Sequence, residues 1–409
     1  MAKQAGKLRS FWRYARLRGR KFLVKAVGRL MSKDKDEVEE RVARYKVGLF
    51  VDGVERQKNG WTQFACSAGN VKLLHCAGGA DDYVPPFIYE WHNAKFLTEF
   101  VDRFGLDKLL ASASGEYDAV VRLSEWLGMQ WEHGTDVVPG GRLVCDPIAV
   151  VMAGRGGSRF WCEIAARTAV HAFAALGWVS RIVTASRDGY TWEHAVAEIW
   201  INEFSKWMLV DTDFNVIYEC DGVPLSAWDL CHHGPQMQRE ATLSVRRFAR
   251  IKDGIHDQDL LPYYAYIHVD MRTDWCSREI RRGSPAGGDL ATWWSARPLL
   301  DSVVTAAVRI QDSARFNWNV NFTNVYVRTA SQRKLGDWEL EVGLGGYSPV
   351  FSHFELNIDS RGWVKVDGAT AILRLLGGNH NLKARMCTVS GFYGAQTEIA
   401  FRIVSELQQ

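Results

Sequence analysis

From about residue 316 to the end of the chain, hydrophobic and polar residues alternate with a period of two. The run from Leu382 to Met386 is the clearest case. Such alternation is typical of strands that bury one face and expose the other. Turn-forming Gly, Asn, Asp and Ser residues separate five expected strands, at 322–327, 338–342, 363–366, 382–387 and 397–404. Short strands at this spacing predict a β-sandwich, which we place at 306–409.

In the first half of the chain, several hydrophobic runs recur at helical spacing instead. The longest begins near Cys162 and ends before Gly177, a natural C-terminal stop for a helix. Shorter helices are expected near 94–104 and 117–131, and the glycine-rich stretch 133–160 is expected to be mostly loop. Five strand-like runs are also expected, at 47–51, 71–74, 179–185, 195–201 and 207–211.

These patterns predict an α+β protein built from several regions, and a chain of 409 residues allows two or three domains. The expected regions are a basic N-terminal arm at 1–46, a small N-terminal region at 47–105, a core at 106–235, a connecting region at 236–305 and the β-sandwich at 306–409.

The charge is unevenly distributed, although the net value is only +3. Residues 1–33 hold eleven Lys or Arg and no acidic residue, whereas the rest of the chain is mildly acidic. Hydrophobic residues within 7–31 recur at helical spacing, which favours a basic amphipathic helix. Such a helix can attach to an anionic membrane or polymer, or it can be a solvated arm or dock on the body of the protein. No nucleic-acid partner is expected.

The composition favours a soluble protein with reduced thiols. No apolar run approaches the roughly 20 residues that a membrane-spanning helix needs. The eight cysteines lie far apart and form no CxxC pair, which favours free thiols in a reducing compartment over a disulfide scaffold. We therefore expect a cytoplasmic location, with at most peripheral contact to a membrane.

The stretch 154–213 has the most informative motifs. A glycine-rich turn precedes Cys162 at the expected helix start, and the helix ends in the pattern L-G-x-x-x-R-x-V. The pattern H-x-x-x-E then begins at His194, and W-x-x-x-D ends at Asp211. This ordered set resembles the transglutaminase-like superfamily, strongly over about sixty residues and loosely over 110–215. The resemblance implies a papain-like core, with a helix packed on an antiparallel sheet, and the catalytic residues Cys162, His194 and Asp211.

Elementary chemistry supports the same three residues. A thiol is a poor nucleophile at neutral pH unless its thiolate is stabilised, and the first turn of a helix offers unpaired N–H groups and the positive end of the dipole. A nearby imidazole promotes thiolate formation and can protonate the leaving group, the role assigned to His194. Asp211 would accept a hydrogen bond from the other ring nitrogen and fix the tautomer.

The negative oxygen that forms during attack on a carbonyl also needs hydrogen-bond donors. The backbone N–H of Cys162 is one. The resemblance implies a tryptophan some thirty-odd residues upstream as the second, and both Trp126 and Trp131 are candidates. Glu198 shares a strand face with His194, and we interpret it as a structural residue that pairs with Arg181.

Other candidate sites have weaker support. Cys220, Cys231, His232 and His233 are an alternative set of metal ligands. Their spacing matches no common zinc ligand set, so no metal is predicted. The glycine-rich turn at 154–157 lacks the Lys-Ser/Thr pair of a phosphate loop, and no calcium loop is present. No cofactor is expected. Trp318, Trp338 and Trp363 are expected to be core residues.

Two functions remain possible from the sequence. The first is an enzyme that forms an acyl-thioester at Cys162 from a protein, a peptide or another amide-bearing substrate. Water or an amine then resolves the thioester, in a peptidase or amidase reaction or in a transglutaminase reaction. The second is a non-catalytic transglutaminase-like scaffold, which binds a polymer or membrane through the β-sandwich and the basic arm.

Overall fold

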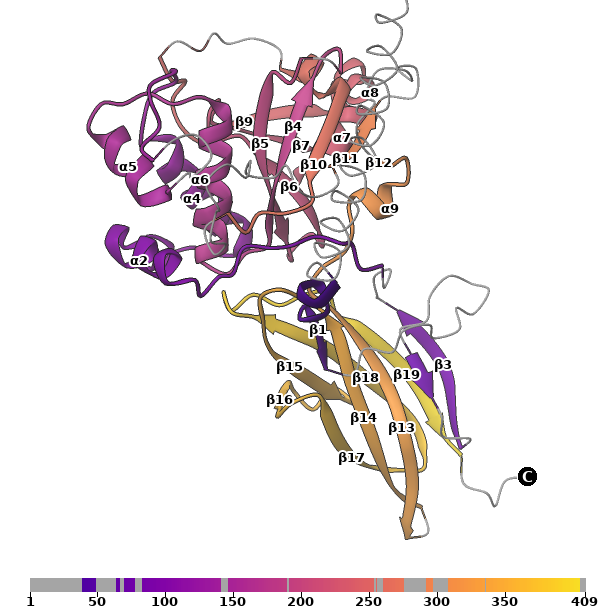
Figure 1. Ribbon diagram of the computed structural model, residues 1–409. Coiled ribbons are helices and arrows are strands. Elements are labelled where there is room, and N and C mark those ends of the chain that lie inside the picture. Colours follow the sequence, from indigo (N-terminus) through magenta and orange to yellow (C-terminus); the bar gives the residue numbers. More distant parts are fainter. Residues whose placement is uncertain are drawn as a thin grey trace, which may run out of the picture.

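The computed structural model describes most of the chain after residue 38. The described residues are 39–48, 64–66, 70–77, 83–140, 146–189, 191–253, 255, 260–275, 292–296, 308–334 and 336–404. They form two lobes, one that combines helices with strands and one built mainly of strands (Figure 1). We call these the α/β lobe and the two-sheet lobe. The combination of helices with several antiparallel sheets agrees with the expected α+β class, whereas the basic run 1–33 lies outside the described residues.

The α/β lobe is organised around a six-stranded sheet of order β12-β11-β10-β4-β5-β6. Its strands are β4 (Ser180–Ser186), β5 (His194–Ile201), β6 (Lys206–Val210), β10 (Tyr266–Asp270), β11 (Thr292–Ala296) and β12 (Val308–Arg309). Neighbouring strands are antiparallel except for β11 and β12. All eight residues of β5 are buried, so helices or loops cover both faces of the sheet at this strand.

Helices α2 to α6 gather on one side of this sheet (Figure 1). They are α2 (Lys95–Phe104), α3 (Leu106–Leu110), α4 (Glu116–Gly128), α5 (Pro147–Arg155) and α6 (Cys162–Ala175). Helix α6 packs directly on β4 and β5. Every residue of α6 from Ile164 to Ala174 is buried, including Arg167 and His171, so the rest of the lobe covers this central helix on all sides. The backbone of Gly177, with φ +84°, ends the turn after this helix.

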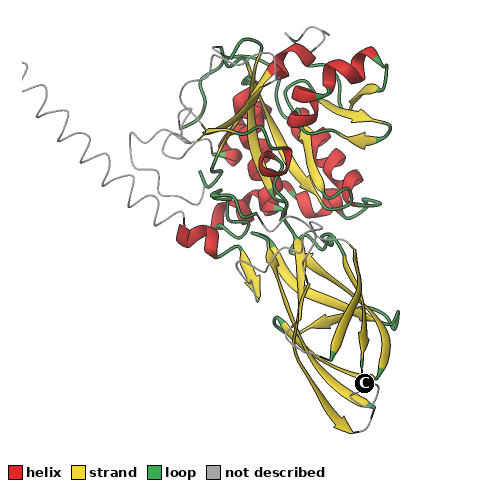
Figure 2. Cartoon of the chain, turned by 90° about the vertical axis from the view of Figure 1, so that its right-hand side faces the viewer, coloured by secondary structure: helices red, strands yellow, loops and turns green. Residues whose placement is uncertain are grey.

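Shorter elements complete the α/β lobe. A three-stranded sheet of order β8-β7-β9 comprises β7 (Val216–Cys220), β8 (Val223–Pro224) and β9 (Leu243–Arg247). Further helices with described bounds are α7 (Ala227–His232), α8 (Gly234–Arg239), α9 (Ser313–Phe316) and the 3₁₀ helix η1 (Leu261–Ala265). Figure 2 shows helices in red and strands in yellow. A reciprocal capping box between Ser226 and Asp229 begins α7. None of the described helices is long and apolar enough to cross a membrane.

Two five-stranded sheets make up the two-sheet lobe. One contains β1 (Lys46–Gly48), β2 (Phe64–Cys66), β13 (Phe322–Lys334), β14 (Asp337–Tyr347) and β17 (Thr370–Leu376). The other contains β3 (Val71–Ala77), β15 (Phe351–Ile358), β16 (Val364–Val366), β18 (Gly378–Thr388) and β19 (Thr397–Ile403). Side chains from both sheets, among them Leu340, Phe354 and Leu382, form one apolar core.

Aromatic and amide contacts join the two lobes. The ring of Tyr45 lies edge-on to Tyr89 of the α/β lobe and to Tyr347 of the two-sheet lobe. The side-chain amide of Asn321 donates to Asn202 Oδ1 at 2.9 Å. Because Tyr45 is buried and contacts both lobes, the end of the region expected to be a basic N-terminal arm, 1–46, is part of the folded body.

The region expected to be a connection, 236–305, instead supplies strands. Strand β10 pairs with β4 on one side and β11 on the other, near the middle of the main sheet. Most of β10 is buried, and a strand covered on both faces loses the period-two alternation that would identify it. The core of the α/β lobe therefore extends well past residue 235.

Two other expected regions also differ in the structure. The N-terminal region 47–105 is divided, because β2 and β3 join the two-sheet lobe whereas α2 joins the α/β lobe. Past residue 306, β12 still pairs with β11 of the α/β lobe. The stretch 133–160, expected to be mostly loop, contains α5. The side chain of Asp146 caps the N-terminus of this helix by accepting hydrogen bonds from the N–H groups of Ile148 and Ala149.

Two of the three tryptophans expected to be core residues are buried. Trp318 and Trp338 are buried as expected, but Trp363 is only half-buried and its ring faces the Arg385 guanidinium at 3.9 Å. This cation–π interaction gives the half-buried Trp363 ring a favourable contact outside the core.

Candidate active site

The thiol of Cys162 lies at the first residue of α6. The carbonyl of Trp161 accepts the first hydrogen bonds of the helix, from the N–H groups of Ile164 and Ala165. No side chain caps this end of the helix, so its unpaired N–H groups favour a negative charge close to the sulfur. The residue is partly exposed, as a nucleophile that must reach a substrate needs to be.

His194 and Asp211 meet at one end of the main sheet. Strands β5 and β6 pair with Ala197 opposite Val210, which brings the first residue of β5 near the residue that follows β6. The Nε2 atom of His194 lies 2.6 Å from Asp211 Oδ2, and both side chains are buried. The other carboxylate oxygen of Asp211 accepts hydrogen bonds from the N–H groups of Asp213 and Phe214. Asp211 is thus fixed by the backbone and in turn fixes the imidazole.

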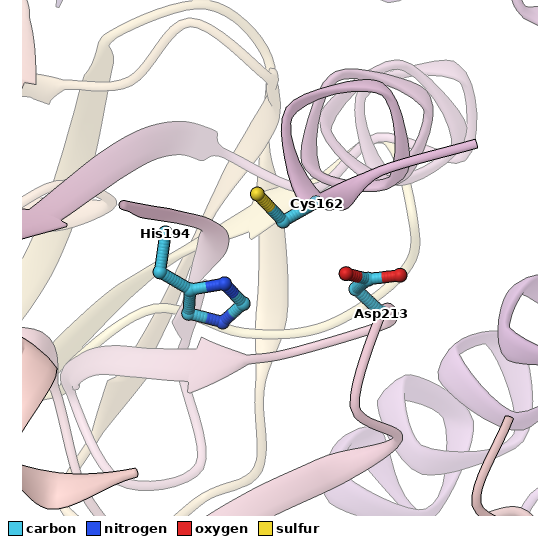
Figure 3. Close-up of side chains that lie close together, drawn as sticks. All are labelled: Cys162, His194 and Asp213. Carbon is cyan, nitrogen blue, oxygen red and sulfur yellow. The ribbon is translucent and has the colours of Figure 1, made fainter. Parts of the chain in front are cut away.

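The imidazole of His194 lies between the thiol and the Asp211 carboxylate. One ring nitrogen of His194 and Cys162 Sγ are within 4.8 Å of each other, and the ring edge that carries this nitrogen faces the sulfur (Figure 3). Burial opposes protonation of the ring, but the charge and hydrogen bond of Asp211, together with the interaction with Cys162, raise the pKa of His194 well above its usual value. The three residues predicted from the sequence are therefore brought together.

A second buried carboxylate, Asp213, belongs to the same cluster and was missed by the sequence analysis. A carboxylate oxygen of Asp213 lies within 4.8 Å of both Cys162 Sγ and a ring nitrogen of His194 (Figure 3). Its carboxylate contacts His133 Nδ1 at 2.9 Å and 3.1 Å. The only signal in the sequence was an acidic residue two positions after Asp211, because His133 is far away along the chain.

Lys252 places a buried amine near these carboxylates. The side chain is 2% exposed, and Nζ has no hydrogen-bond partner among the described residues. Burial lowers the pKa of Lys252 to about 8, although the charges of Asp213 and Asp211 act in the opposite direction. The Nζ atom lies 5.2 Å from the centre of the Trp131 ring.

The two tryptophan candidates for an oxyanion donor have different surroundings. Trp126 is partly exposed and packs on Phe100 and Phe104 of α2, with Arg155 over its ring. Trp131 is buried, and its Nε1–H has no acceptor among the described residues. The Cβ that any larger residue would have at Gly154 would lie 2.9 Å from Trp131 Cβ, so this glycine allows α5 to approach Trp131. Of the two, Trp131 is the buried tryptophan with an unused donor.

Glu198 has the structural role predicted for it. Its carboxylate forms a fully buried ion pair with Arg181, with Nε–Oε2 and Nη2–Oε2 distances of 2.7 Å and 2.6 Å. The other oxygen accepts a hydrogen bond from the N–H of Ala227 at the start of α7. Arg181 in turn donates to the carbonyl of Phe316 in α9. The pair therefore connects the sheet to two helices beside it.

The alternative metal site does not assemble. Cys231 is buried with Sγ near the carbonyl of Ala265, and His232 Nε2 contacts the Ser295 hydroxyl. Within the described part of the chain, the single group of three potential metal ligands that converge is Cys162, His194 and Asp213.

No protein-family model matches the chain, and no curated protein is similar enough to count as a relative.

Proposed function

We propose that the protein is a thiol-dependent acyl-transfer enzyme of transglutaminase-like type. The observation that supports this most directly is the buried imidazole of His194, which is fixed by Asp211 on one side and faces the Cys162 thiol on the other. The packing of α6 on β4 and β5 supports the part of the proposal that requires a helix on an antiparallel sheet. The two five-stranded sheets of the other lobe are consistent with a β-sandwich, although β1, β2 and β3 come from before the core.

The reaction begins with the Cys162 thiolate, formed as His194 takes up the thiol proton. The sulfur attacks the carbonyl carbon of an amide or ester, and the carbonyl oxygen becomes negative. Collapse of this intermediate breaks the bond to the leaving amine or alcohol, which takes the proton from His194. The acyl group remains on Cys162 as a thioester. Water or an amine then attacks the thioester, gives a proton to His194, and releases the acid or the new amide as the thiol re-forms.

The oxyanion requires donors that are already in place. The N–H of Cys162 at the start of α6 is one, and the Nε1–H of Trp131 is the second in this proposal, because it is buried without an acceptor. Replacing Trp131 by Phe is expected to slow acylation by roughly 10²-fold, the effect of losing one such donor. Replacing Trp126 by Phe is the matched control and is expected to change the rate little.

The experiment that tests the proposal measures thiol reactivity and acyl-enzyme formation together. The protein is treated with limiting iodoacetamide, and peptide mapping by mass spectrometry gives the labelling rate of each cysteine. We expect Cys162 to react faster than the partly exposed Cys220, and we expect this advantage to disappear in His194→Ala. With p-nitrophenyl acetate, intact mass spectrometry should then find one acetyl group on Cys162.

The controls distinguish an enzyme from a scaffold. Cys220→Ser should acylate normally, whereas Cys162→Ala should not acylate at all. If Cys162 reacts no faster than Cys220 and no acyl adduct forms, the enzyme proposal is wrong and the scaffold function is favoured. For the scaffold, binding to anionic vesicles that is unchanged after removal of residues 1–33 would exclude a membrane role for the basic arm.

A further inference from the structure

Three potential metal-ligand atoms of different chemistry face one another at the candidate active site. They are Cys162 Sγ, a ring nitrogen of His194 and a carboxylate oxygen of Asp213, all within 4.8 Å of one another (Figure 3). Thiolate, imidazole and carboxylate are the ligand types that zinc binds in proteins, and three protein ligands with one open position are typical of an exchangeable zinc site.

The spacing is close to that of a tetrahedral ion. With the usual zinc–ligand bond lengths, ligand atoms around zinc are roughly 3.3–3.6 Å apart. The three atoms therefore need to approach one another by at most about 1.5 Å, which rotation of the Cys162 and Asp213 side chains can supply. No backbone movement is needed, since the helix start and the end of the sheet already place all three residues.

The surroundings of two of these ligands are those of a metal site. Zinc-binding imidazoles almost always donate their second ring N–H to a carboxylate or carbonyl, and ligating carboxylates are themselves hydrogen-bonded. Asp211 holds Nε2 of His194, which leaves Nδ1 for an ion. His133 Nδ1 contacts the carboxylate of Asp213 at 2.9 Å. Both side chains are thus oriented by partners that would remain in place around a bound ion.

Charge also favours a divalent cation here. When Cys162 and His194 share one proton, the pair has no net charge. The two carboxylates of Asp211 and Asp213 then exceed the single positive charge of Lys252 by one negative charge. Binding of Zn²⁺ in place of that shared proton adds two positive charges and releases one. The charges of Asp211, Asp213, Lys252, the Cys162 thiolate and the ion would then sum to zero.

We propose that Cys162, His194 and Asp213 form a binding site for one Zn²⁺ ion. Three bonds form, from zinc to the sulfur, to Nδ1 and to one carboxylate oxygen, and the shared proton leaves to solvent. Water occupies the fourth position. Zinc lowers the nucleophilicity of the sulfur and occupies the ring nitrogen of His194 that would carry the proton, so it acts as a reversible block of the thiol. This inference goes beyond the proposed acyl transfer, and it does not depend on it.

The test uses the full chain and two metal ions. Zn²⁺ is titrated against a chromophoric chelator to obtain its affinity and stoichiometry, and Co²⁺ is used for its near-ultraviolet sulfur-to-metal absorption. We expect one equivalent to bind, with loss of the Co²⁺ absorption in Cys162→Ala. Asp213→Asn should weaken Zn²⁺ binding at least 10-fold. Asp211→Asn should weaken it about 10- to 100-fold, the usual effect of removing such an orienting partner. The exposed Asp253→Asn is the matched control, and its affinity should be unchanged.

A second measurement needs no variant. Saturating Zn²⁺ should protect Cys162 from iodoacetamide while Cys220 is labelled at its usual rate, and a chelator should restore the labelling of Cys162. Equal affinities for Asp213→Asn and Asp253→Asn, or protection of Cys220 in place of Cys162, would overturn the zinc site. Acetylation by p-nitrophenyl acetate is measured separately in metal-free buffer, so that failure of zinc binding and failure of acyl transfer are independent results.

Discussion

The two lobes differ in what they bury. Among the described residues, every buried charged side chain lies in the α/β lobe, whereas the buried polar residues of the two-sheet lobe are uncharged. An apolar cluster occupies the centre of the two-sheet lobe, and its ion pairs, such as Glu339 with Arg374, are exposed or only partly buried. The α/β lobe instead contains Arg181–Glu198 and His194–Asp211 in its interior.

This difference shows where the chain retains costly interactions. Removing charges from water costs several kcal/mol per ion, so a buried pair is often no more stabilising than well-packed hydrophobic residues. The described part of the two-sheet lobe contains no buried charged side chain. The α/β lobe contains several, and one buried pair, His194–Asp211, belongs to the candidate active site, where the carboxylate holds the imidazole. Four substitutions, with one further substitution as a control, test this contrast between the lobes.

The largest effect on stability is expected from Glu198→Gln. The substitution leaves the Arg181 guanidinium buried without its counter-charge, and such a loss typically costs about 3–5 kcal/mol. Urea denaturation followed by tryptophan fluorescence measures the change. The control is Glu339→Gln in the two-sheet lobe, which removes one partner of an exposed pair and should cost about 0–1 kcal/mol. Equal losses in the two variants would remove the proposed distinction between the lobes.

A packing defect in the two-sheet lobe is expected to be next. Leu340 is fully buried between the two sheets, and its replacement by Ala should cost about 2–5 kcal/mol through lost contacts and a cavity. The rate of iodoacetamide labelling at Cys162, measured without denaturant, should not change. A large change in that rate would show that the apolar lobe also controls the chemistry of the other lobe.

A smaller, pH-dependent effect is expected at Glu116, at the start of α4. Burial raises the pKa of Glu116 to about 7, although the N–H of Glu203, the Asn202 amide and the Trp178 indole donate hydrogen bonds to it. Because the folded protein holds this proton more tightly than the unfolded chain, the associated stability is full below about pH 4.5 and is lost as pH rises through about 7.

In Glu116→Gln this loss is absent, since the side chain no longer titrates. The stability of the variant relative to the unmodified protein should therefore increase by about 3 kcal/mol at most between pH 4.5 and pH 8. Urea denaturation at several pH values gives this difference. A difference that stays constant with pH would contradict the raised pKa.

The smallest expected change in stability is at Asp211, because His194 can release its proton when the carboxylate is removed, whereas Arg181 stays charged. The clearest readout is the titration of the His194 ring. In Asp211→Asn the main charge that favours protonated His194 is removed, so burial prevails and the pKa of His194 should fall. In the unmodified protein, protonation of His194 contributes stability that is full below about pH 6.5 and is lost as pH rises through the higher folded value.

Nuclear magnetic resonance of the His194 ring protons measures both titrations. The variant should lose the pH-dependent stability above pH 6.5 together with the raised pKa. An unchanged titration of His194 would show that Asp211 does not control the imidazole, and it would weaken the proposed catalytic role of both residues.

Much of the site could be predicted from the sequence because its residues lie at ends of regular elements. Cys162 begins a helix, His194 begins a strand and Asp211 follows one, so motif order and spacing were enough to select them. Asp213, His133 and Lys252 were not predicted. They come from separate loops, and only the folded chain places them together.

The missed strands have local physical causes. In β15 the regular alternation is short, with Phe354 and Leu356 buried between partly buried polar residues. A register shift between Phe351 and His353 lies directly before it. In β17 the residues alternate between exposed and half-buried, and Ile372 and Leu376 point to solvent. The hydrophobic pattern of β17 therefore does not indicate which face is inside.

Strand β3 from the early part of the chain pairs with β19 close to its end, with Val71 opposite Ile403. The α/β lobe is thus an insertion between the first and last strands of a discontinuous domain. During synthesis on the ribosome, the two-sheet lobe cannot close until its final strand has emerged. All of the α/β lobe will have been made by then, so the thiol site can assemble before β19 is available to pair with β3.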